Sequence, residues 1–149
     1  MFSAWQVWSE SISNWRAPEA VEHLQLNEGL PIPARAGLRP NQVLVRIRAA
    51  SVNARDIMVI ANDLKVPLKT ARNLTPCADG AGEIGFAGQS TGLEEGQKVI
   101  ITPGAWEAGS DTPSLEAFQG KGAGSAQGTL RQYAVLVSRL STLSRFEMS

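Results

Sequence analysis

Three polar or charged residues, Asn53, Arg55 and Asp56, surround a single alanine where the most regular strand pattern of the chain ends. The asparagine amide both donates and accepts hydrogen bonds, and the charged pair is suited to orienting a ligand or moving a proton. These residues therefore suit the polar edge of a cleft. The alternative is purely structural: a strand exit followed by a helix whose first turn is stabilised by Asp56.

A second pattern with chemical meaning is the spacing G-x-G-x-x-G over residues 80–85. In a dinucleotide-binding fingerprint these glycines follow a strand and open a helix, and an acidic residue comes about 20 positions later. Here Pro76 and Cys77 precede the glycines, and strand-like residues follow them. The context favours structural glycines in a twisted strand over a phosphate-binding loop.

His23 and Cys77 are the only histidine and the only cysteine of the chain. One histidine cannot form a metal-binding pair, and one cysteine forms neither an intramolecular disulfide nor a cysteine-rich zinc site. No cationic residue lies close to Cys77 in sequence to lower its pKa. We expect packing roles for both, with Cys77 half-buried.

Strands dominate the elements that must position these candidates, because short alternating apolar runs are separated by turn residues. Residues 56–64 predict a short helix, and residues 29–41 and 104–128 predict loops. The first two strands should pair as the arms of a hairpin. The expected strands are residues 4–8, 21–26, 42–53, 80–88, 98–103 and 129–137.

The composition argues against several classes of function. The 14 basic and 14 acidic residues balance and are scattered, which argues against nucleic-acid binding. No apolar run is long enough for a membrane helix, and the first residues lack the pattern of a signal peptide. We therefore expect one cytoplasmic domain that acts on neither nucleic acid nor membranes.

Four segments, in this order, resemble the medium-chain dehydrogenase/reductase superfamily. They are residues 42–56, 76–84, 93–99 and 128–135. The resemblance spans residues 3–137 and implies a mainly β fold. The expected fold is a GroES-like, partly open β-barrel with one or two short helices and without a Rossmann domain. It also implies that residues 1–137 form the GroES-like catalytic domain, followed by a divergent C-terminal tail, residues 138–149.

At the positions where zinc-dependent members carry metal ligands, the chain resembles the zinc-independent, quinone oxidoreductase-like members. Zinc-dependent members carry a cysteine at the position of Asn53 and a His-Glu pair at Ala78-Asp79. Alanine has no donor atom for zinc, so no catalytic zinc is expected. The resemblance implies an NADPH-dependent reductase that delivers hydride to a conjugated carbonyl of a small molecule.

The same resemblance assigns site residues. Asn53, Arg55 and Asp56 would lie at the substrate cleft, and Asp79 and Tyr133 would add groups for acid–base or orienting work. Trp106 and Phe118 would lie beside the substrate. A tyrosine is common in relatives at the position of Ala54, so one hydroxyl of that pattern is missing.

The sequence ends where the family continues into its nucleotide-binding domain. The expectation is a truncated reductase that does not bind NADPH by itself, with a homodimer or a partner chain covering its open edges. Two alternatives stay open. The chain is a cofactor-free descendant that uses the cleft for binding or for a cyclisation, isomerisation or dehydration, or it is an inactive product.

Overall fold

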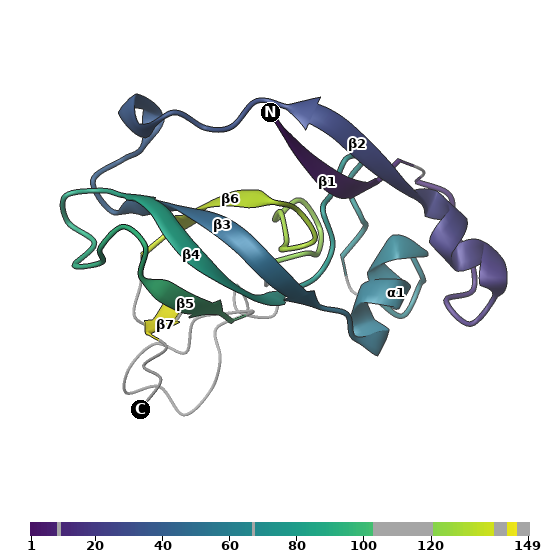
Figure 1. The fold of residues 1–149 in the computed structure, drawn as a ribbon. Helices are drawn as coiled ribbons and strands as arrows, with labels where there is room; N and C mark the ends of the chain where they lie inside the picture. Colours follow the sequence, from purple (N-terminus) through teal and green to yellow (C-terminus); the bar gives the residue numbers. More distant parts are fainter. Residues whose placement is uncertain (9, 67, 103–120, 139–142, 146–149) are drawn as a thin grey trace.

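The computed structural model describes the whole chain except residues 9, 67, 103–120, 139–142 and 146–149. Its strands form two antiparallel sheets (Figure 1). The smaller is a hairpin of β1 (Phe2–Val7) and β2 (Leu24–Leu30). The larger has the strand order β6-β3-β4-β5-β7. All pairings of the named strands are antiparallel, so the mainly β fold is confirmed.

Strand β3 (Gln42–Ser51) is the longest strand and lies inside the larger sheet, next to its β6 edge. It pairs with β4 (Asp79–Ala87) on one side and with β6 (Tyr133–Val137) on the other. Strands β5 (Lys98–Ile101) and β7 (Leu143–Arg145) extend the sheet beyond β4. The expected tail thus contributes an edge strand through residues 143–145.

The core fills one face of this sheet. Val43 and Val45 of β3 are fully buried, as alternation predicted, and Leu44 between them is buried as well. The buried cluster has valine, isoleucine, leucine and alanine side chains from four strands. Their burial stabilises the fold roughly in proportion to the apolar area that is removed from water. Its members are Val43, Val45, Ile84, Val99, Ile101, Ala134 and Leu136.

The glycines of residues 80–85 lie in β4, in the middle of the sheet. A Cβ atom on Gly82 would stand 2.4 Å from the carbonyl oxygen of Arg46 in the neighbouring strand, so the two backbones approach too closely for a side chain. The glycines are structural, as expected. They do not open a helix, so this segment is no dinucleotide loop.

Several element boundaries differ from the predictions. Residues 21–23 lie in a 3₁₀ helix, Pro18–His23, so the second hairpin arm begins later and extends to Leu30. The predicted loop that follows contains a 3₁₀ turn, Arg35–Gly37. Residues 129–132 precede β6 instead of belonging to it.

Helix α1 (Ala54–Ile60) begins earlier and ends earlier than the predicted 56–64. It stops because Asn62 takes a left-handed conformation with φ +50°, which a helix cannot continue through. The Asn62 side chain donates to the Glu10 carbonyl at 2.9 Å and accepts from the Thr70 N–H at 3.0 Å. Long-range contacts therefore end this helix.

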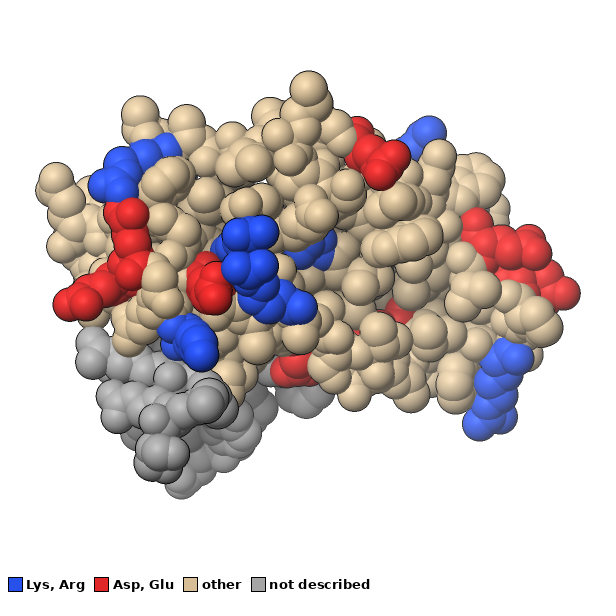
Figure 2. Space-filling model, viewed as in Figure 1, with Lys and Arg blue, Asp and Glu red and all other residues tan. Residues whose placement is uncertain are grey.

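Charged side chains on the face viewed in Figure 2 form small mixed groups, in keeping with the balanced composition. Of the helices in the described part of the chain, none has the length and apolar character that crossing a bilayer requires.

Candidate active site

Helix α1 starts at the exit of β3 and places the first candidates. The backbone N–H of Asn53, the residue before the helix, donates to Oδ2 of Asp56 at 2.8 Å. The Asp56 side chain is buried, with 1% of its surface exposed. Burial raises its pKa, against the opposing effect of the Asn53 and Cys77 backbone N–H groups and of Arg55. The predicted stabilisation of the helix start by Asp56 is confirmed.

Arg55 lies beside this carboxylate and reaches a distant segment. Its Nη1 is 3.8 Å from Oδ1 of Asp56 and donates to the backbone carbonyl of Lys121 at 3.4 Å. Arg55 thus links the start of α1 to the backbone at Lys121. The side chain is partly exposed, so it can still meet a ligand.

We call the junction of the end of β3, the start of α1 and the start of β4 the corner, and the residues leading into β4 form its second side. Cys77 is buried rather than half-buried and has φ +71°, a conformation that side chains other than glycine rarely adopt. Its carbonyl accepts the Thr129 N–H at 2.8 Å, and the Thr129 hydroxyl donates to the Asp79 carbonyl at 2.6 Å. These bonds fix the backbone that carries Asp79.

Asn53 and Asp79 come together at this corner. Ser51 at the end of β3 pairs with Asp79 at the start of β4. The Asn53 amide nitrogen lies 3.5 Å from Oδ2 of Asp79 and 3.4 Å from the Ser51 hydroxyl oxygen, both at the long end of hydrogen bonding. An amide held this loosely has donor capacity left for a ligand.

Lys121 is a member of the corner that sequence reasoning missed. Its Nζ donates to the carbonyl of Thr102, just beyond β5, at 2.8 Å. Burial lowers the pKa of this ammonium, and Asp79 acts in the opposite direction, which places the two charges near each other. The residue stands between two glycines at the end of a Gly-, Ser- and Ala-rich stretch, and nothing in that pattern signals a site.

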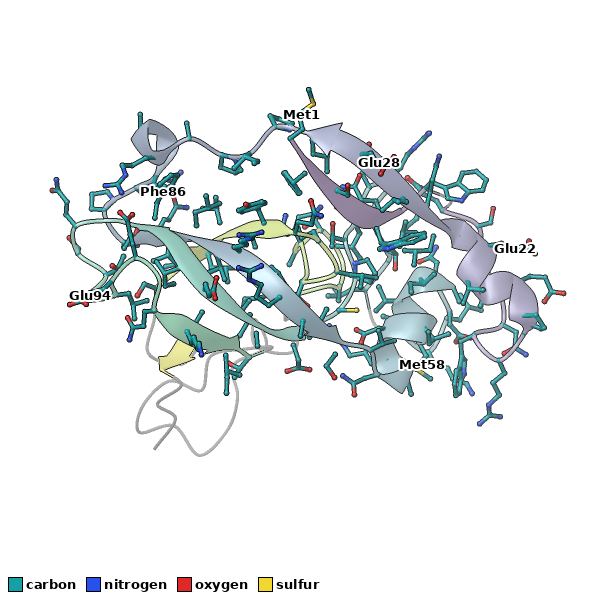
Figure 3. All side chains as sticks on the ribbon, viewed as in Figure 1. Met1, Glu22, Glu28, Met58, Phe86 and Glu94 are labelled. Carbon is teal, nitrogen blue, oxygen red and sulfur yellow. The ribbon has the colours of Figure 1, made fainter. Side chains whose placement is uncertain are left out.

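Tyr133 lies elsewhere. It pairs with Arg46 in the middle of β3 and packs edge-on against Phe2, with ring centroids 5.9 Å apart. Five positions of β3 separate Arg46 from Ser51, which is about 17 Å at the usual rise of a strand. Figure 3 shows α1, marked by Met58, at the opposite end of the sheet from Phe86 and Glu94. The structure therefore does not bring Tyr133 to the corner.

The other candidates stand apart from the corner or outside the description. His23 ends a 3₁₀ helix before β2, is partly buried and accepts the Trp8 N–H on its carbonyl at 3.0 Å. That is a structural position, as expected. Trp106 and Phe118 lie outside the described residues, so their predicted place beside a substrate stays a prediction.

A groove of about 410 Å³ separates the hairpin from β3. Trp5 and Leu26 form its apolar side, and Arg48 and Arg131 contribute charge. The β3–β6 pairing stops at Arg46, so the edge of β3 beyond it borders this groove. A homodimer or partner chain covering such an edge stays a prediction.

The side chains at the corner are poor ligands for a metal ion. Among the described residues, no group of three or more His, Cys, Asp or Glu side chains is placed to hold a metal ion. Burial, Asp56 and Asp79 raise the pKa of the Cys77 thiol to about 12, so the thiolate that binds zinc is disfavoured.

The comparisons with known proteins agree with this architecture. The model of the alcohol dehydrogenase GroES-like domain matches residues 39–143, which is more than half of the chain. The chain belongs to this family. The GroES-like fold that the motifs predicted is therefore confirmed, in the alcohol dehydrogenase lineage.

A curated member of the lineage is a zinc-type alcohol dehydrogenase-like protein of Schizosaccharomyces pombe. It is 33% identical over 100 residues, which are 66% of this chain and 28% of the relative. The matched region thus covers under a third of that protein's length.

Solved structures show the same fold at low sequence identity. A putative alcohol dehydrogenase from Sinorhizobium meliloti has a TM-score of 0.69 and 22% identity, over 97% of this chain and 38% of that one. The quinone oxidoreductase from Coxiella burnetii has a TM-score of 0.63 and 19% identity, over 97% of this chain and 36% of that one. At these identities the likeness concerns the fold alone.

Proposed function

We propose that this domain forms the substrate side of the active-site cleft in a zinc-independent, NADPH-dependent reductase of the quinone or enoyl reductase type. The observation that carries the proposal is the corner where Asn53, Asp79 and Lys121 meet. It combines an amide, a carboxylate and an ammonium on three segments far apart in sequence. Such a set can orient a substrate carbonyl and transfer a proton to its oxygen.

The chemistry of the donor set supports zinc independence. Ala78 offers no donor atom, and the Asp56 carboxylate is buried and accepts the Asn53 N–H. The high pKa of Cys77 removes the remaining strong ligand. Zinc prefers thiolate, imidazole and accessible carboxylate, and this corner supplies one accessible carboxylate, Asp79.

The described residues do not fit NADPH. The glycines of residues 80–85 run through β4, and no helix N-terminus follows them for a pyrophosphate. We therefore propose that a separate nucleotide-binding domain, in the same polypeptide or in another, holds the nicotinamide. The bound cofactor supplies the hydride. This domain's own residues would bind and orient the substrate carbonyl, with the amide of Asn53 as donor.

A cofactor-free descendant is the second candidate, because Asp79 and Lys121 provide acid–base groups without any nucleotide. Titration of the 149-residue chain with NADPH, followed by nicotinamide fluorescence and by melting temperature, bears on it. Saturable binding would count against a cofactor-free protein. No binding, together with conversion of an enone without nucleotide, would favour it.

A chimera tests the main proposal. Residues 1–145 of this chain, which include β7, replace the matching domain of the Coxiella burnetii quinone oxidoreductase, whose fold they share. The expected result is NADPH oxidation that depends on a conjugated enone or a quinone, with loss in Asn53→Ala. A chimera that folds and binds NADPH but turns over no conjugated carbonyl would overturn the proposal. The parent enzyme is the control.

A further inference from the structure

Lys121 is held at the corner by contacts on both its side chain and its backbone. Its Nζ donates to the Thr102 carbonyl at 2.8 Å, and its own carbonyl accepts from Arg55 at 3.4 Å. The next residue, Gly122, lies so close to Cys77 that a Cβ there would stand 2.7 Å from the Cys77 carbonyl oxygen. The segment is therefore fixed against the start of β4, which carries Asp79.

The charges around Lys121 come from two elements. Arg55 and Asp56 belong to the first turn of α1, and Asp79 is the first residue of β4. Asp79 attracts the ammonium, yet the ion pairs within 4.0 Å among the described residues do not include this pair. The two groups thus influence each other across a gap instead of neutralising each other by direct contact.

We propose that Lys121 is the proton donor of this site and that it binds and protonates the carbonyl oxygen of the substrate. The inference rests on the proposed function, because either candidate reaction creates negative charge on that oxygen. Hydride addition gives an enolate or alkoxide, and an isomerisation gives an enolate. The ammonium N–H bond breaks and its electron pair stays on nitrogen. The proton forms an O–H bond, and water later reprotonates the amine.

Partial burial suits this role. A lysine in water holds its proton too tightly for efficient transfer at neutral pH, and burial brings its pKa toward the working range. Asp79 opposes this effect, because its negative charge favours the protonated ammonium. The hydrogen bond to the Thr102 carbonyl does not by itself account for the electrostatic interaction of Lys121 with Asp79.

The first test measures the titration of Lys121 in the 149-residue chain by NMR of ¹³C-methylated lysines, assigned with Lys121→Arg. The expected result is a Lys121 pKa below the ordinary value for a lysine side chain, and a further fall in Asp79→Asn because an attractive charge is lost. A Lys121 pKa at or above the ordinary value that does not change in Asp79→Asn would overturn the inference.

The second test uses 4-nitrophenol, a planar oxyanion mimic that is yellow only when ionised. Wild type should bind the anion, and Lys121→Met should bind it about tenfold more weakly or worse, because a charge-assisted hydrogen bond is lost. Lys65→Met is the matched control, and Lys121→Arg should retain the anion. Equal binding by wild type and Lys121→Met, with circular dichroism unchanged, would contradict the proposal.

The two proposals fail in different ways. If the chimera reduces enones while neither Lys121 result appears, the reductase stands and the proton donor is another group. If both Lys121 results appear while a folded, NADPH-binding chimera is inactive, the reductase is wrong and Lys121 remains an oxyanion-binding residue.

Discussion

The backbone N–H of Asn53 donates a 2.8 Å hydrogen bond to the carboxylate of Asp56, three residues further along the chain. The bond satisfies one of the donors that a helix start leaves free and turns the Asp56 side chain into the protein. The Asn53 side chain is left pointing toward Asp79. One short segment therefore both begins the helix and presents an amide at the candidate site.

Asp56 should make the protein less stable as the pH rises. Its folded pKa is raised by burial above the ordinary value of 3.8, so the folded state keeps a proton that the unfolded chain has lost. Its contribution to the free energy of unfolding is present below the unfolded pKa and is lost as the pH rises through the folded pKa. Urea unfolding at a series of pH values from below 3.8 upward should show that the free energy of unfolding changes less with pH in Asp56→Asn than in wild type. Removing the exposed carboxylate in Glu28→Gln is the control, and parallel curves for wild type and Asp56→Asn would contradict the prediction.

Thr129→Val should lower the free energy of unfolding by about 1–3 kcal/mol. The substitution keeps the volume but removes the hydroxyl that donates to the Asp79 carbonyl at 2.6 Å. Thr129→Ser retains the donor and should lose less. Urea denaturation of the three proteins measures the difference, and equal stability of the valine and serine variants would argue against a structural role for this bond.

Gly128→Ala should destabilise the domain by about 3 kcal/mol or more, because overpacking against backbone leaves no side chain that can move aside. The added Cβ would stand 2.1 Å from the Cys77 carbonyl oxygen and 2.3 Å from that of Pro76. Gly37→Ala is the matched control, since its Cβ would meet nothing within 4 Å. Thermal melts compare the two; similar melting temperatures would mean that the corner is looser than described.

Cys77 should be unreactive in the folded protein. A pKa of about 12 instead of the ordinary 9.0 lowers the thiolate fraction about 1,000-fold at neutral pH, and burial blocks access as well. Iodoacetamide should label the thiol only in urea. Labelling of the folded chain at pH 8 as fast as that of a free cysteine would contradict both the burial and the pKa.

Much of the fold was predictable from local patterns. The alternation of Val43 and Val45 located strand β3, and the glycines of residues 80–85 were identified as structural because Pro76 and Cys77, rather than a strand, precede them. A short helix was predicted from Asp56 onward, two residues after α1 begins. These features depend on neighbours within a few residues, so the sequence contains them.

Contacts between distant residues could not be predicted in this way. Lys121 lies at the corner because the adjacent Gly122 packs against Cys77. Tyr133 lies away from the corner because β6 pairs with the middle of β3. The end of α1 depends on Asn62 bonding to Glu10 and Thr70. No single-sequence pattern encodes these pairings.

The most direct measurement is the rate of enone-dependent NADPH oxidation by the chimera before and after dialysis against a zinc chelator. The account predicts a rate that the chelator leaves unchanged and that Asn53→Ala lowers. A rate that disappears with the chelator and returns with added zinc would contradict the central claim that this corner works on its substrate without a metal.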